Sequence, residues 1–168
     1  MMKSSKGKMP VVAPTHGQKT LYAAGSLRQT GGGLTPLRGT VADHILRMLQ
    51  LLDGQERTAY SIWRIPAGET DPMAVGETFI QAGGSAQAMT VEARVMTSDG
   101  TARLFTVGRQ EPVKGPPTTI WINDRAQVTV SSNEVFTAEE AAVVFLTFYL
   151  TDTVAQPYQL RELNFGDG

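Results

Sequence analysis

The segment 137–150 constrains the fold of this chain more than any other. Thr137 and Glu140 have the Thr-x-x-Glu spacing of a helix capping box, and Phe136 precedes the cap, where an apolar residue packs against the first turn. All but one of the residues 141–150 are apolar. A helix that is apolar on most sides is buried on most sides. We therefore predict that this helix lies on a sheet at the centre of the core.

A second helix is predicted to begin at Thr40. Its hydroxyl and the carboxylate of Asp43, three residues later, can each accept a hydrogen bond from a free N–H of the first turn. Apolar residues then recur at helical spacing, and Gly54 follows them as a glycine often follows the last turn of a helix. This apolar stripe consists of Val41, Ile45, Met48, Leu49 and Leu52.

The middle of the chain has the composition and the alternation of β-strands. Ser98, Asp99 and Gly100 separate two alternating runs and predict a hairpin, and the residues around 123–125 predict a second one. We expect one strand to stop before Gly83 and Gly84. The predicted strands cover residues 60–65, 77–81, 89–95, 103–108, 118–122, 126–130 and 158–165. Antiparallel strands with helices on one side define an α+β domain, here a sheet of about five to six strands with two main helices packed on it.

The first 39 residues differ in composition from the remainder. Pro10, Pro14 and the run Gly31–Gly33 interrupt them, so we expect residues 1–39 to form an irregular, largely flexible leader and residues 40–168 to form a single α+β domain. Residues 1–40 hold six basic residues and no acid, whereas residues 41–168 hold nine bases and sixteen acids, a net charge of −7. An acidic body suits a basic partner, although it also simply keeps a protein soluble.

Few residues of the chain can perform catalysis. There is no cysteine, and the two histidines, His16 and His44, lack the spacing of a zinc site. No Gly-x-Ser-x-Gly motif is present, and the glycine-rich runs lack the context of a phosphate-binding loop. We therefore expect a protein that is not an enzyme and that has no cofactor and no metal. A small enzyme that uses only carboxylates stays open, since their spatial pairing is invisible in a sequence.

The composition also limits the partners that we expect. Only one lysine, Lys114, lies beyond residue 40, so binding of nucleic acid by the folded body is not expected. No apolar run approaches the roughly 18 residues of a membrane helix, and the N-terminus lacks the apolar region of a secretory signal. Together with the absence of cysteine, this indicates a cytoplasmic protein with no membrane partner.

The C-terminal half resembles a known family. The resemblance covers roughly residues 76–165 and lies in the segments 79–84 (FIQAGG), 89–94 (MTVEAR), 128–130 (VTV), 133–141 (NEVFTAEEA), 148–149 (FY) and 160–163 (LREL). In order and spacing these segments are similar to the first-numbered immunity family of bacterial polymorphic toxin systems, which is associated with nucleic-acid deaminase toxins. The resemblance implies a non-catalytic inhibitor that binds its cognate toxin, one to one, and occludes the active site of that toxin.

The loops and hairpin tips supply the candidate toxin-binding residues. Acidic side chains there would suit the basic substrate groove of a nucleic-acid (cytosine) deaminase, and a tryptophan would act as a buried anchor. For each of these residues the alternative is an ordinary surface or core position. The candidates are Glu69, Asp71, Asp99, Glu111, Asp124, Trp121 and Trp63. The main alternative to an immunity protein is a structural or assembly protein of a phage or secretion system, in which the Gly-rich leader and the hairpins would serve as subunit arms.

Overall fold

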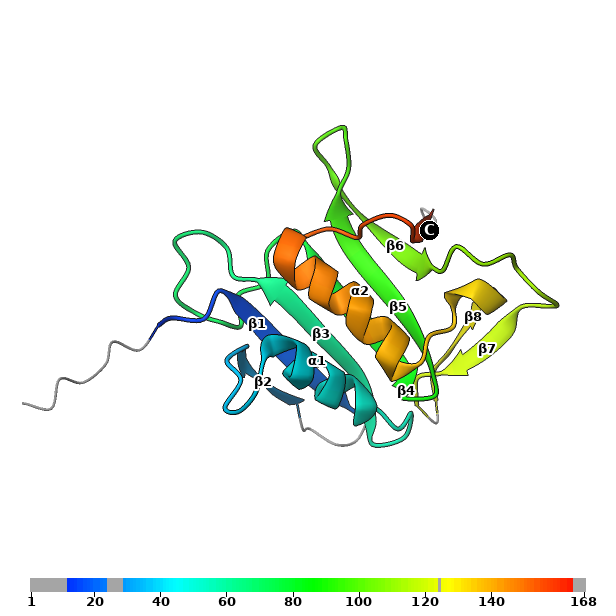
Figure 1. The fold of residues 1–168 in the computed structure, drawn as a ribbon, viewed down its shortest axis with the longest axis horizontal. Helices are drawn as coiled ribbons and strands as arrows, with labels where there is room; N and C mark the ends of the chain where they lie inside the picture. The colour runs from blue at the N-terminus through cyan, green and yellow to red at the C-terminus, as the bar shows by residue number, and fades with distance from the viewer. Residues whose placement is uncertain (1–11, 24–28, 124, 165–168) are drawn as a thin grey trace, which may run out of the picture.

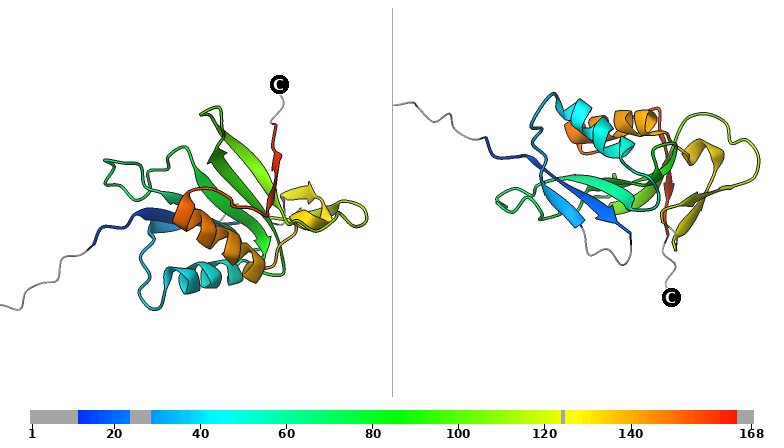
Figure 2. Two further views of the ribbon diagram at one scale, coloured as in Figure 1. Left: turned by 45° about the horizontal axis from the view of Figure 1, so that its top comes forward. Right: turned by 90° about the horizontal axis from the view of Figure 1, so that it is seen from below.

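The computed structural model describes residues 12–23, 29–123 and 125–164. It confirms the α+β class: a seven-stranded antiparallel sheet has the strand order β2-β1-β3-β4-β5-β6-β9, and β7 and β8 form a separate two-stranded sheet. Both α-helices cover the same face of the large sheet, and the other face is open (Figures 1 and 2). The elements are β1 (His16–Tyr22), β2 (Gln29–Gly33), α1 (Val41–Gln50), β3 (Arg57–Arg64), β4 (Phe79–Ser85), β5 (Ala88–Met96), β6 (Ala102–Gly108), β7 (Thr118–Trp121), β8 (Gln127–Val130), the 3-10 helix η1 (Ser132–Glu134), α2 (Ala138–Thr151) and β9 (Gln159–Glu162).

Both helices begin where the sequence predicts. Thr40 caps α1 and forms a reciprocal capping box with Asp43. Thr137 caps α2, because its hydroxyl accepts a hydrogen bond from the N–H of Glu140 at 3.3 Å. At its C-terminal end α2 is closed by Asp152, whose φ of 58° is left-handed. Local side chains therefore set the boundaries of the helical layer, as the capping motifs indicate.

The core lies between this helical layer and the sheet. Phe145 of α2 stacks on Tyr60 of β3, with ring centroids 5.8 Å apart, and both side chains are fully buried. Further strands contribute Ile80, Ala82, Val91 and Ala93 to the same cluster. The prediction that α2 is buried on most sides is wrong for its outer face, where Val143 is 56% exposed and Leu150 is 66% exposed.

The prediction that residues 1–39 are irregular is wrong over two segments. β1 pairs with β3 in an antiparallel register from His16 to Tyr22, and β2 pairs with the other side of β1. Long-range pairing overrides the weak strand propensity of these residues, because β3 offers a free edge that β1 completes. The single domain therefore begins well before residue 40 and includes two strands of the sheet.

Two smaller corrections concern the number of strands and the end of one of them. The sheet has seven strands rather than five to six. β4 continues through Gly83 and Gly84 instead of stopping before them, since β5 pairs with both residues. The predicted hairpins appear as the β5–β6 and β7–β8 pairs, and the predicted closing strand appears as the shorter β9. Among the residues that the structure describes, no helix has the length and apolar character needed to cross a membrane.

Candidate binding site

The open face of the large sheet carries a row of polar side chains from six neighbouring strands. Side chains alternate between the two faces of a strand. Because Tyr60 and Ile62 contact the helical layer, their neighbour Ser61 points to the open face. The strand register then places one polar residue beside the next across the sheet. This polar row consists of Lys19, Ser61, Gln81, Glu92, Thr106 and Arg161, of which Ser61 and Thr106 are themselves buried.

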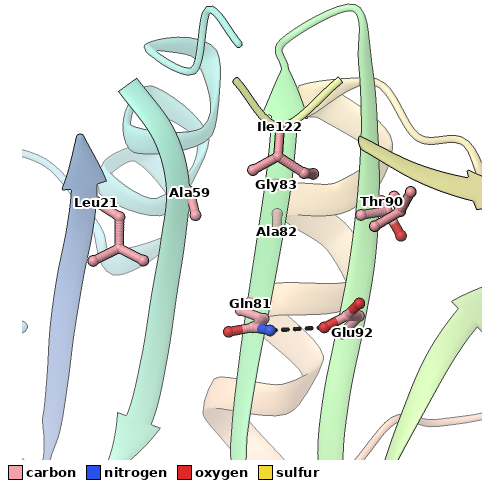
Figure 3. Close-up of a pocket in the computed structure, with 9 residues that line it drawn as sticks. Leu21, Ala59, Gln81, Ala82, Gly83, Thr90, Glu92 and Ile122 are labelled. Atoms are coloured by element: carbon pink, nitrogen blue, oxygen red, sulfur yellow. Dashed lines mark hydrogen bonds between the residues drawn. The ribbon is translucent and has the colours of Figure 1, made fainter. Parts of the chain in front are cut away.

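A hollow lies beside the polar row. Ala59, Gly83 and Thr90 are paired in the next row of the register, and Gly83 lets the β7–β8 hairpin come close. A Cβ atom on Gly83 would lie 2.9 Å from Cδ1 of Ile122, so a side chain there would displace the hairpin. The hollow has a volume of about 230 Å³ (Figure 3). Its lining consists of Leu21, Ala59, Gln81, Ala82, Gly83, Thr90, Glu92, Ile122 and Val128.

A second, smaller hollow lies on the other side of the polar row. The loop 65–78 forms its wall, and Trp63 fixes that loop, because its indole Nε1 donates a hydrogen bond to the carbonyl of Pro72 at 3.2 Å. Gly17 makes room for this arrangement, since a Cβ atom there would lie 2.5 Å from the indole nitrogen. The volume of this hollow is about 160 Å³. The loop and the β7–β8 hairpin thus bound the open face at two ends (Figure 1).

The charges of the open face are partly paired. Gln81 donates a hydrogen bond to Glu92 at 2.7 Å. Arg161 donates two hydrogen bonds to Glu134, at 2.7 Å and 3.0 Å. Burial raises the pKa of Glu134, but the bonds from Arg161 and from the N–H of Ser131 outweigh it and hold that pKa below its usual range. Glu134 is therefore charged at neutral pH and engages the guanidinium of Arg161.

Three charged side chains of this face are unpaired. Within the described part of the chain, neither Glu92 nor Lys19 nor Arg94 has an ion-pair partner. Lys19 lines only the smaller hollow, and Glu92 supplies the only charge in the lining of the larger one. Unpaired charges cost little on a solvated surface and become available to a partner.

The predicted acidic residues do not form one patch. Four of them are exposed, and each has a local hydrogen-bonding or ion-pairing role in its own loop. Glu69 accepts bonds from the N–H groups of Thr70 and Asp71, and Asp71 accepts one from Met73. Because Glu69 and Asp71 share the loop 65–78, they lie at one end of the open face. Asp124 lies outside the described residues.

Asp99 and Glu111 lie in two other loops. Asp99 accepts hydrogen bonds from the hydroxyls of Thr101 and Thr97 in the β5–β6 turn, and these bonds hold its pKa far below the usual range. Glu111 follows β6 and contacts Arg109 at 3.4 Å. Asp99 therefore organises the β5–β6 turn, whereas Glu111 only pairs with Arg109, and both lie in other loops than Glu69 and Asp71.

The two tryptophans have opposite environments. Trp121 is 56% exposed on the β7–β8 hairpin, so its side chain is available to a partner. Trp63 is 1% exposed, and the loop 65–78 covers it. The prediction of Trp63 as a contact residue is therefore corrected: it supports the loop from beneath.

Both histidines lie on the helix-covered side of the sheet. His16 is 2% exposed, packs on Tyr149 and has Nε2 3.9 Å from Oδ1 of Asp152. Burial, with a smaller contribution from Arg64, lowers the pKa of His16, and Asp152 opposes this shift. His44 of α1 contacts Oε1 of Gln18 at 2.8 Å. In the described residues, no group of three or more His, Asp or Glu side chains is arranged to hold a metal ion.

Sequence reasoning missed the polar row as a site. The alternation over residues 89–95 predicts that Glu92 points to solvent, but only the register of β1, β3, β4, β5, β6 and β9 shows which side chains lie beside it. Comparisons of the chain with protein-family models, with curated proteins and with solved structures gave no significant match.

Proposed function

We propose that this chain is an immunity protein, a cytoplasmic inhibitor that binds one molecule of a cognate bacterial toxin through the open face of its sheet. The observation that carries the proposal is the polar row between two hollows, bounded by a projecting loop and a projecting hairpin. A surface with two hollows, unpaired charges and apolar walls is suited to recognition of another protein. The resemblance of residues 76–165 to a deaminase-associated immunity family supports the same reading.

The charge of the partner follows from this surface and from the acidic body. Residues 41–168 carry a net charge of −7, and Glu69 and Asp71 are exposed in the loop 65–78 beside the smaller hollow. A toxin that deaminates nucleic acid needs a basic surface around its active site to attract phosphates. Occupation of that surface by this chain would exclude the substrate, and the opposite charges would accelerate the encounter.

Co-expression with the product of the neighbouring gene tests the proposal. We expect the chain to restore growth of cells that express this product and to form a one-to-one complex with it. Rescue should persist when His16 and His44 are both changed to alanine, provided that the variant is folded. Absence of any stable complex, or turnover of a substrate by the purified chain alone, would refute the proposal.

A second candidate is a structural or assembly protein, and one edge of the sheet favours it. β2, at one edge, has exposed residues and no charged side chain, whereas β9, at the other edge, is short and carries the charged Arg161 and Glu162. Unprotected edges are templates for pairing with another chain. Native mass spectrometry separates the candidates, since a ring or filament supports assembly, whereas a monomer that becomes a one-to-one complex supports immunity.

A further inference from the structure

The larger hollow of the open face has an unusual combination of polar groups at its base. Thr90 is 4% exposed, yet its hydroxyl has no hydrogen-bond partner among the residues that the structure describes. Buried polar groups normally have a partner, because leaving one unpaired costs about 1–3 kcal/mol. A hydroxyl that lines a hollow without a protein partner therefore indicates that a ligand completes its bonding.

The polar atoms around Thr90 are acceptors. The carboxylate of Glu92 can only accept, so the amide nitrogen of Gln81 must face it, as the 2.7 Å bond shows. This fixes the orientation of the amide and turns Oε1 of Gln81 away from Glu92, toward the side of β3 (Figure 3). Gln81 Oε1 has no partner within the described residues, and the carboxylate of Glu92 has no ion-pair partner among them. The base of the hollow thus offers free acceptors and the negative charge of Glu92, which also acts at longer range on Arg161 of the same row.

The walls of the hollow are apolar. Leu21, Ala59, Ile122 and Val128 surround the polar base, and none of the described residues that line it is cationic. Its volume of about 230 Å³ is below the roughly 300–1,000 Å³ of sites that enclose drug-sized molecules. A hollow with apolar walls and hydrogen-bond acceptors at its base fits a side chain with an aliphatic stem and a cationic head.

We propose that this hollow is a receptor for one lysine or arginine side chain of the bound partner. The aliphatic stem packs between Leu21 and Ile122, and the cationic head donates hydrogen bonds to Glu92, Gln81 and Thr90. This inference deepens the proposed function, because it names the group that the open face recognises on the toxin. It requires no toxin to be tested, so its failure and the failure of the immunity proposal can be told apart.

The test is titration of the isotope-labelled full chain, followed by NMR, with four capped amino acids. Two are cationic, N-acetyl-lysine methylamide and N-acetyl-arginine methylamide, and two are neutral controls with similar stems, the norleucine and citrulline analogues. We expect saturable shifts at Gln81, Thr90 and Glu92 with a cationic probe, and binding of the neutral probes to be weaker by roughly tenfold or more. Comparison of the two cationic probes shows whether the site prefers an ammonium or a guanidinium.

Matched variants locate the binding. Glu92→Gln keeps the shape of the side chain and its contact with Gln81 but removes the charge. It should lower the affinity for the cationic probe roughly tenfold. Thr90→Val removes only the unpaired hydroxyl, and it should also weaken the binding of the cationic probe while the protein stays folded. Glu162→Gln removes an exposed carboxylate of β9 and should have no effect. Equal binding of the neutral probes, shifts away from the hollow, no saturable shift, or unchanged affinity in Glu92→Gln would each overturn the proposal.

Discussion

The two faces of the large sheet are built from alternate residues of the same strands, yet they have opposite properties. On the helix-covered face Tyr60, Ile80 and Val91 are fully buried in the core. Their sequence neighbours Ser61, Gln81 and Glu92 belong to the polar row of the open face. One face of the sheet therefore stabilises the domain, whereas the other is free to carry a binding surface.

The largest expected effect is on the helix-covered face. Phe145→Ala removes a fully buried ring that stacks on Tyr60, and it should lower the free energy of unfolding by about 3–5 kcal/mol. Leu104→Ala, on the open side of β6, should cost clearly less because its side chain is already partly exposed. Urea denaturation measures both. Equal losses would contradict the division of the sheet into a structural face and a free face.

A smaller effect is expected where the loop 65–78 closes over the sheet. Gly17→Ala would place a Cβ atom 2.1 Å from the carbonyl oxygen of Pro72, so the loop must shift, at a cost of about 1–3 kcal/mol. Tryptophan fluorescence should report the exposure of Trp63, and denaturation should report the loss of stability. Lys19→Ala in the same strand is the control. An unchanged Gly17→Ala protein would show that the loop is not held by Trp63.

The pH dependence of stability should come in part from the helix-covered face. Because burial lowers the pKa of His16, the unfolded chain takes up a proton on this residue before the folded one does. The stability associated with His16 is therefore complete above its unfolded pKa of about 6.5 and falls as the pH drops below it. His16→Gln should flatten the decline between pH 7 and pH 5 without removing it, since burial also lowers the pKa of His44. A decline that is identical in the variant, measured by denaturation at each pH, would argue against this role.

The smallest effects on stability belong to the unpaired groups of the open face. Lys19→Ala and Arg94→Ala should each change the free energy of unfolding by no more than about 0.5 kcal/mol, because neither side chain has an ion-pair partner to lose among the described residues. Calorimetry checks this prediction. A loss of more than about 1.5 kcal/mol in either variant would mean that the open face stabilises the fold, which would contradict the division of the sheet into a structural face and a free face.

Local signals in the sequence were sufficient for much of the fold. The caps at Thr40 and Thr137 gave the starts of both helices, and the alternation around Ser98–Gly100 gave the β5–β6 hairpin. β1 was missed because Gly17, Gln18 and Lys19 have weak strand propensity, and only pairing with β3 makes them a strand. No local pattern in the sequence predicts such a long-range pair of strands.

The candidate site was harder to predict for the same reason. Acidic residues in loops are the candidates that the sequence offers, but Asp99 lies in the β5–β6 turn and Glu111 pairs with Arg109 in another loop. Glu92 and Gln81 come from adjacent strands, and their proximity depends on the β4–β5 pairing. The burial of Trp63 could not be predicted, because a tryptophan in a strand gives no indication of which face of the sheet a distant loop will cover.

The most direct test of the account compares two charge substitutions, one on each side of the molecule. Glu92→Arg reverses the charge at the centre of the polar row, and Val143→Arg places the same side chain on the exposed outer face of α2. Binding of the neighbouring gene's product to the folded variants is measured by calorimetry. We expect Glu92→Arg to abolish binding and Val143→Arg to leave it intact. Retained binding in the first variant and lost binding in the second would place the contact surface on the helical layer and contradict the central claim.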